Sequence, residues 1–427
     1  MSQGELLIAF IAICAATIAT KTVSDSDLAS NGKALARPRL DSIDALRGLV
    51  MVIMALDHVR DFFTVARFEA TNLSKTTTAY FFTRWITHFC APVFVFLAGT
   101  GAFLAGKRRT KKELSWLLLT RGLWLVIVEL TIVRFALFFN VDYHASFLQV
   151  IWVIGVSMMA LAGLIYLPTK FVTALGLIIV AGHNLLDRFQ PDDFGRWRWL
   201  FGILHGAVGQ IPPDPPTVIQ WHPGYFIIVL YPLLPWLGVL LVGYGFGQIY
   251  QMESEQRRRL LVKLGLGLII AFIILRATNL YGDPHKWVTQ KNAWFTFLSF
   301  INCEKYPPSL LFLLMTLGPA IVLLSFLEKH TGKIAKPLIV YGRVPFLYYV
   351  VHFTLAHFLA VVFMVIKYGP SILHQALDPS TPAPPGWGYS LPVVYLIWIS
   401  IVVALYPMCA WFAGVKQRRR DAWLSYL

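Results

Sequence analysis

The residues best suited to chemistry in this sequence are histidines in or beside long apolar stretches. His58 follows the uniformly apolar run 51–56 and stands beside Asp57, with Arg60 and Asp61 close behind. Ionisable groups are costly to bury in a membrane, so they usually face a cavity, a partner or a pathway. Imidazole titrates near neutral pH and can take a proton from a hydroxyl or an amine. His58 is therefore the first candidate general base, with Asp57 beside it in the candidate catalytic set. The alternative is that His58 only ends a span at the membrane interface.

Three further histidines and a tyrosine complete the candidate catalytic set. His88 lies four residues after Arg84, so both are expected on one helix face. Tyr349, His352 and His357 share another apolar stretch. The five-residue spacing of the last two histidines is poor for joint metal ligation from one helix, and no metal site is predicted. Two alternatives stay open: His88 as a buried polar contact between helices, and haem ligation by histidines of facing helices.

Polar residues near the start of the same region suggest a place for an anion. Asp44 suits the N-terminus of a helix. Arg47, one turn further on, requires an anionic partner, which is either Asp41 or Asp44 or a phosphate-bearing cofactor. Arg343 is expected at a similar depth, and two arginines could hold a pyrophosphate by charge-assisted hydrogen bonds. The candidate cofactor-binding residues are Arg47, Arg343, Asp44 and Arg84.

The elements that position these residues are predicted to be membrane helices. The 427 residues are 57% hydrophobic and 14% charged, with a mean hydropathy of +0.63. Soluble chains carry about a quarter charged residues, so the sequence predicts an all-α, polytopic transmembrane helical bundle of about 10–11 spans. The net charge of +15 falls in short clusters between apolar stretches. This pattern is typical of loops on the cytoplasmic side and excludes a nucleic-acid partner.

The apolar stretches give approximate bounds for ten spans. Residues 1–36 are expected to form an N-terminal apolar segment and linker, and 37–427 the membrane domain. The segment 6–20 could span, anchor or be cleaved, and a retained helix is favoured. The spans are expected at 43–63, 79–105, 113–139, 147–167, 171–186, 225–250, 260–281, 309–327, 338–366 and 392–415.

The basic clusters also predict which side each loop faces. Residues 107–112, 257–259 and 418–420 fall on one side if the spans alternate, and that side is expected to be cytoplasmic. His58, His88 and His357 then come to similar depths in the half away from the cytoplasm. The outer loops supply six more ionisable residues, each expected to be solvated although each could contact a polar substrate: His205, His222, Asp283, His285, Glu304 and Lys305.

Five segments of the chain carry a family resemblance. Leu40–Gly48 (LDSIDALRG), with His58 ten residues later, resembles the opening motif of the transmembrane acyltransferase superfamily. The other segments are Thr87–Gly99, Tyr231–Gly247, Lys305–Pro319 and Gly342–His357. From residue 37 to the C-terminus the chain looks most like bacterial relatives of heparan-alpha-glucosaminide N-acetyltransferase.

The resemblance implies an acyltransferase of the bacterial inner membrane. Such an enzyme takes an acetyl or other acyl group from cytosolic acyl-CoA and delivers it to an extracytoplasmic sugar or glycan, at a hydroxyl or an amine. The wider superfamily places the catalytic histidine at His58 and also needs Arg47. The lysosomal enzyme has Asn at this position and its catalytic histidine near Glu69, where this chain has none, so the role is carried to His58.

The leading hypothesis from the sequence is thus acyl transfer by a multi-pass membrane enzyme. His58 would deprotonate the acceptor, and His88 or Tyr349 would stabilise the oxyanion of the thioester. The alternative is a proton-coupled transporter of a small polar solute, in which the same histidines relay protons. A third interpretation is a structural subunit of an envelope-assembly complex. A homodimer is one assembly that the sequence allows.

Overall fold

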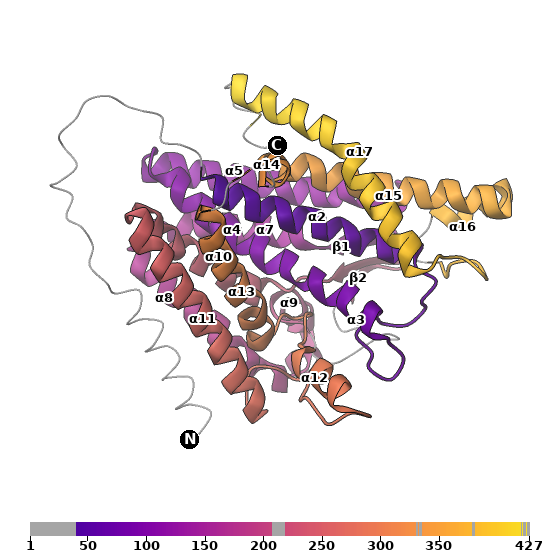
Figure 1. Cartoon of the computed structure of the whole chain (residues 1–427), viewed down its shortest axis with the longest axis horizontal. Coiled ribbons are helices and arrows are strands. Elements are labelled where there is room, and N and C mark those ends of the chain that lie inside the picture. Colours follow the sequence, from indigo (N-terminus) through magenta and orange to yellow (C-terminus); the bar gives the residue numbers. More distant parts are fainter. Residues whose placement is uncertain are drawn as a thin grey trace.

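The computed structural model describes residues 40–206, 218–329, 332, 335–377, 381–419, 421 and 424. The N-terminal segment and linker expected at 1–36 lie outside these residues. About 75% of the structure is helical, and in the described part eight helical stretches are long and apolar enough to cross a membrane. The expectation of an all-α polytopic bundle is confirmed (Figure 1).

The long helices follow the predicted order. The first half contains α2 (Asp41–Phe63), α3 (Thr78–Trp85) continuing through the 3-10 turn η2 (Ile86–Phe89) into α4 (Cys90–Gly106), α5 (Lys111–Val128) joined by the π-turn η3 (Glu129–Val133) to α6 (Arg134–Phe138), α7 (Val150–Leu164) and α8 (Thr169–Gly182). The second half contains α10 (Leu233–Phe246), α11 (Ser254–Thr278), α13 (Leu310–Lys329), α14 (Ala335–Arg343), α15 (Pro345–Tyr368) and α17 (Leu391–Arg418).

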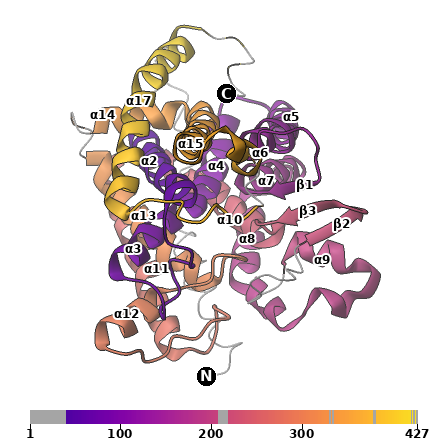
Figure 2. The same ribbon diagram turned by 90° about the vertical axis from the view of Figure 1, so that its right-hand side faces the viewer.

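Shorter elements fill the connections between these helices. They are η4 (His183–Arg188), η5 (Pro191–Trp197), α9 (Arg198–Leu204), η6 (Gly247–Gln251), α12 (Ala293–Ile301), η7 (Pro370–Ile372) and α16 (Leu373–Leu377). Three strands, β1 (Ala145–Leu148), β2 (Val218–His222) and β3 (Tyr225–Val229), form a sheet in the order β1-β3-β2. β1 runs parallel to β3 and β2 runs antiparallel to it, and Figure 2 shows this sheet beside α9.

The structure corrects three of the predicted spans. The span expected at 225–250 begins as strand β3, since its β-branched residues favour a strand, and its helix starts only at Leu233. The span expected at 147–167 likewise begins in β1, and its helix starts at Val150. The span expected at 338–366 is broken before Pro345, which has no N–H to continue the helical ladder of α14.

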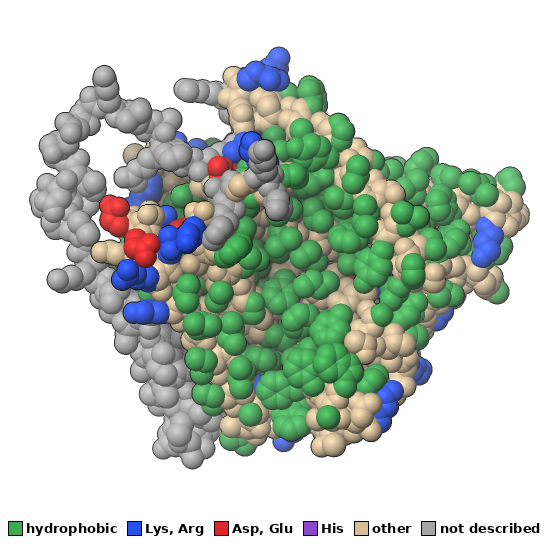
Figure 3. Space-filling model, in the orientation of Figure 1, with side chains coloured by type: hydrophobic (Ala, Val, Ile, Leu, Met, Phe, Trp, Pro, Cys, Tyr) green, Lys and Arg blue, Asp and Glu red, His purple; other side chains and the backbone are tan. Residues whose placement is uncertain are grey.

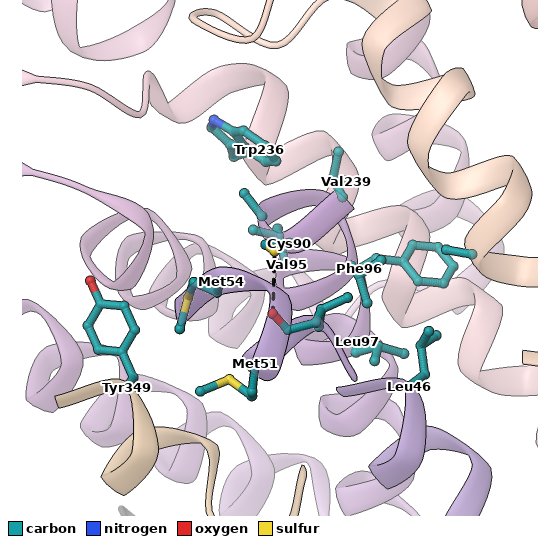
Figure 4. Close-up of a cluster of buried hydrophobic side chains, with 14 of the residues drawn as sticks. Leu46, Met51, Met54, Cys90, Val95, Phe96, Leu97, Trp236, Val239 and Tyr349 are labelled. Atoms are coloured by element: carbon teal, nitrogen blue, oxygen red, sulfur yellow. Dashed lines mark hydrogen bonds between the residues drawn. The ribbon is translucent and has the colours of Figure 1, made fainter. Parts of the chain in front are cut away.

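α2 is the helix around which the others pack. It contacts α4, α13, α14, α15 and α17, and Figures 1 and 2 show it in the middle of these helices. Its contact with α4 includes the Cys90 thiol, which donates to the Val50 carbonyl at 3.3 Å among the buried side chains drawn in Figure 4. α2 carries charged residues near both ends and is not one of the eight long apolar stretches. Most of its residues are nevertheless buried.

Large apolar side chains cover the outside of the bundle. Figure 3 shows a broad hydrophobic face over the helices, with charged groups gathered near its edges. Ile270 and Ile274 of α11 and Leu396 and Val403 of α17 are each more than half exposed. Exposed apolar area on this scale requires a nonpolar solvent, because soluble monomers rarely expose such patches. The chain is an integral, multi-pass membrane protein.

The contact between α2 and α14 leaves no room for a side chain. A Cβ on Gly48 would lie 1.8 Å from the Leu338 carbonyl oxygen, and one on Gly342 would lie 1.8 Å from that of Asp44. Both obstacles are backbone atoms, which cannot rotate away. Two glycines therefore permit the two helix backbones to touch, as small residues do in membrane bundles generally.

Gly48→Ala is expected to destabilise the protein by about 1–3 kcal/mol or more, because the two helices must separate to admit the methyl group. The thermal midpoint of the detergent-purified protein measures the effect. Gly101→Ala in α4 is the matched control, since its Cβ would meet no atom within 4 Å. Equal midpoints for the two variants would contradict the close contact.

Candidate active site

A cavity of about 480 Å³ opens next to the Phe63 end of α2. This volume lies within the usual range for small-molecule sites. Its polar lining residues include Asp57, His58, Asp61, Arg67, Arg84, Gln149, Tyr231, Lys305 and Tyr306. Its apolar and aromatic lining residues include Met54, Phe94, Phe147, Tyr349, Phe353 and Met364. The cavity can therefore hold a polar group and an apolar group side by side.

Two helices bring a pair of histidines together at this cavity. His58 Nδ1 lies 2.9 Å from Nε2 of His352, although 294 residues separate them in sequence. The two rings are nearly parallel, with centroids 5.1 Å apart and planes at 11°. His352 is fully buried, whereas His58 is half-buried and lines the cavity. His352 therefore lies behind His58 as seen from the cavity.

The hydrogen bonds of this pair fix the tautomer of both neutral rings. His352 Nδ1 lies 2.7 Å from the Tyr348 carbonyl oxygen, which can only accept, so Nδ1 carries the proton. His352 Nε2 is then an acceptor, and His58 Nδ1 must donate to it. The remaining nitrogen of His58, Nε2, has the lone pair. The arrangement equips His58 to accept a proton from a ligand in the cavity.

Asp57 is held by two arginines rather than by His58. Arg84 donates to both its carboxylate oxygens, at 2.8 and 2.6 Å, and Arg60 lies 3.0 Å away. The side chains of Asp57 and Arg84 are each 13% exposed. This ion pair joins α2 to α3 at the edge of the cavity. Asp57 consequently shapes the charge of the site and does not orient the imidazole next to it.

Lys305 is part of the site, which corrects its expected place as a solvated loop residue. Only 6% of it is exposed, and it lines the cavity. Its Nζ lies 5.0 Å from the ring centroid of Tyr306. Burial raises the pKa of the Tyr306 hydroxyl, but the charges of Lys305 and Arg84 outweigh it, so that the pKa is lowered. In the sequence, the only indication of this role was that Lys305 begins Lys305–Pro319, one of the segments that resemble the family.

His88 lies outside the cavity. It is buried against Phe312 of α13, with ring centroids 5.4 Å apart, whereas Thr87 and Cys90 line the cavity. The expected common face with Arg84 does not form, because η2 is a 3-10 turn and turns each residue further about the axis than an α-helix does. The position of His88 favours the alternative of a buried contact between helices.

His357 and Tyr349 both line the cavity but differ in their contacts. His357 lies between Phe62 and Phe139, and its two nitrogens face the carbonyl oxygens of Ala136 and Ala376 at 2.9 and 3.4 Å. Its ring is thus occupied by structural contacts. Tyr349 lies edge-on to His58, with ring centroids 6.3 Å apart.

The candidate cofactor residues fall into two groups. Arg84 lies at the cavity, whereas Arg47 is eleven residues before His58 on α2, or about 16 Å along the helix. Arg47 donates to Asp44 and to the Gly342 carbonyl, at 3.0 and 3.1 Å. Arg343 pairs with Asp41 at 3.0 Å. Of the partners expected for Arg47, an aspartate or a phosphate-bearing cofactor, the structure shows the aspartate, Asp44.

The helices thus enclose a cavity lined by a histidine and several charged groups. The model of the heparan-alpha-glucosaminide N-acetyltransferase catalytic family matches residues 39–280, more than half of the chain. The chain belongs to this family, and it is a membrane transferase of the acetyltransferase type. No curated protein matches the chain. Asp57, His58 and Arg84 lie inside the matched range, and Lys305 and His352 lie beyond it.

The two arginines around Asp57 give a prediction about stability. Asp57→Asn leaves Arg60 and Arg84 buried without their shared counter-charge and is expected to cost about 3–5 kcal/mol. Asp61→Asn is the control, since its side chain is 56% exposed and its pair with Arg60 faces solvent. Thermal midpoints in detergent compare the two variants. A larger loss for Asp61→Asn would show that the Asp57 network is not the stabilising one.

Proposed function

We propose that this protein transfers an acetyl or other acyl group from cytosolic acyl-CoA to an extracytoplasmic sugar or glycan, at a hydroxyl or an amine. The observation that carries the proposal is the hydrogen-bonded chain from His58 through His352 to the Tyr348 carbonyl, together with the place of His58 in the lining of a cavity of substrate size. Membership in the acetyltransferase family supports the reaction class.

The proposed reaction uses His58 twice. His58 Nε2 takes the proton of the acceptor O–H or N–H while the acceptor atom attacks the thioester carbonyl carbon. The C–S bond then breaks, and the imidazolium of His58 returns its proton to the departing CoA thiolate. Atoms and charge balance without a further reactant. Tyr349, beside His58, is the remaining candidate donor to the oxyanion, since His88 lies outside the cavity.

The two ends of α2 suit the two substrates. Arg47 and Arg343, at the end expected in the cytoplasm, would receive the phosphates of acyl-CoA in exchange for their aspartate partners. His58 and the cavity, at the other end, would receive the acceptor from outside. The basic clusters near Lys107 and Arg258 support this orientation.

His58→Ala is expected to lower acetyl-CoA turnover by about 10²–10⁴-fold with little change in acetyl-CoA affinity, because general-base catalysis is lost while the donor contacts remain. Purified protein in detergent is assayed for CoA-thiol release and, separately, for acetyl-CoA binding. His374→Ala, at an exposed histidine of α16, is the control.

Two outcomes of that assay would contradict the proposal. Normal turnover by a folded His58→Ala protein would remove His58 from the mechanism. Absence of acetyl-CoA binding by the wild type, together with solute flux in vesicles, would favour the proton-coupled transporter instead.

We propose that His352 positions the His58 ring through their hydrogen bond, and variants can distinguish this role from simple packing. His352→Leu removes the acceptor for His58 Nδ1–H and is expected to lower kcat by about 10²-fold, with an altered pH profile and an unchanged KM. His352→Asn can restore an acceptor through its amide oxygen and should recover part of kcat. Equal loss in both variants with an unchanged pH profile would indicate a packing role alone.

A further inference from the structure

Around the polar residues of the cavity lining, more positive charge than negative charge is buried. Arg60, Arg84 and Lys305 are buried or nearly so, and Asp57 is the acid enclosed with them. The other acids that pair with these arginines, Asp61 and Glu69, are 56% and 58% exposed and lie toward the solvent. A buried charge without a counter-charge is costly, so this surplus requires an explanation.

The neighbours of Lys305 do not supply its counter-ion. Glu304 is engaged by His285, with Nε2 and Oε2 3.0 Å apart, and the resulting hydrogen bond raises the pKa of His285. Asp283 accepts from the Ser309 hydroxyl at 2.7 Å and lies 3.6 Å from Arg276. In the part of the chain that the structure describes, Lys305 makes no ion pair with a carboxylate.

Asp57 is also committed to other groups. Its two oxygens receive both contacts from Arg84, and one of them lies 3.0 Å from Arg60. These arginines already exceed the single negative charge of Asp57. Lys305 therefore adds a cation to a site whose internal acid is neutralised, and it does so at the cavity wall, where a ligand can reach it.

We propose that Lys305, with Arg84 in the same cavity lining, forms a subsite for an oxyanion group: a carboxylate, sulfate or phosphate carried by a substrate. An ammonium group binds such a group as a point charge, and desolvation within the membrane strengthens the attraction. Tyr306 adds a phenol on the same wall. The subsite rests on the proposed acyl transfer, because it implies that one of the two substrates is negatively charged. Anion binding can still be measured without turnover.

Binding of inorganic sulfate tests the subsite directly. The thermal midpoint of detergent-purified protein is measured against sulfate concentration, with chloride at matched ionic strength as the reference. The wild-type midpoint should rise with sulfate in a saturable manner. Lys305→Met should weaken the apparent affinity about tenfold or more, whereas Lys305→Arg should retain it. Lys75→Met, at an exposed lysine of an adjacent loop, should bind sulfate as the wild type does.

The source of the oxyanion is distinguished by comparing ligands that differ in charge. S-acetylpantetheine lacks the nucleotide phosphates of acetyl-CoA. If Lys305→Met weakens acetyl-CoA binding but leaves S-acetylpantetheine unchanged, the subsite binds a phosphate of the donor. If glucuronate or glucose 6-sulfate competes with sulfate while glucose and acetyl-CoA do not, it binds an acidic acceptor.

Two results would overturn the subsite. The wild-type midpoint could respond equally to sulfate and chloride, or Lys305→Met could bind sulfate as tightly as the wild type. A protein that binds sulfate through Lys305 but does not turn over acetyl-CoA would retain the anion subsite and refute the acyl transfer.

Discussion

The burial of Asp57 between Arg60 and Arg84 is the interaction on which the site depends. A membrane helix can carry charges inward only if each meets a partner, because lipid offers no solvation to replace water. The two arginines satisfy Asp57 from α2 itself and from α3, and they fix the end of α2 where His58 lies. Since these contacts occupy the carboxylate, His58 must obtain its orientation elsewhere, and the hydrogen bond to His352 provides it.

The opposite end of α2 follows a second constraint, the approach of two backbones. Gly48 and Gly342 allow α2 and α14 to touch, and Arg47 then reaches the Gly342 carbonyl at 3.1 Å. The close approach of α2 and α14 therefore also positions Arg47 and Arg343, which stand next to these glycines. Side-chain packing alone would keep the helices several ångströms further apart. The Arg47-Gly48 pair therefore has a packing role as well as an electrostatic one.

Much of the fold could be predicted from the sequence, but much of the site could not. Apolar stretches near 20 residues indicate helices because the bilayer sets their length. His58 was recognisable because an acid and an imidazole end an apolar run. Its partner His352 was a candidate, but nothing local to either residue indicates a contact across 294 residues. His88 was misplaced because the 3-10 turn η2 rotates it, and Lys305 because a loop position does not show whether other loops cover it.

The relay behind His58 ends on a backbone carbonyl, and the membrane gives a reason. In water-soluble enzymes a carboxylate commonly orients the catalytic imidazole and stabilises its charged form. Here a second buried carboxylate would bring a further desolvation cost. The Tyr348 carbonyl and the neutral His352 fix the same tautomer with dipoles alone. Asp57, the acid buried nearby, is engaged by Arg60 and Arg84, so in the proposed subsite an anionic ligand balances the charge of Lys305.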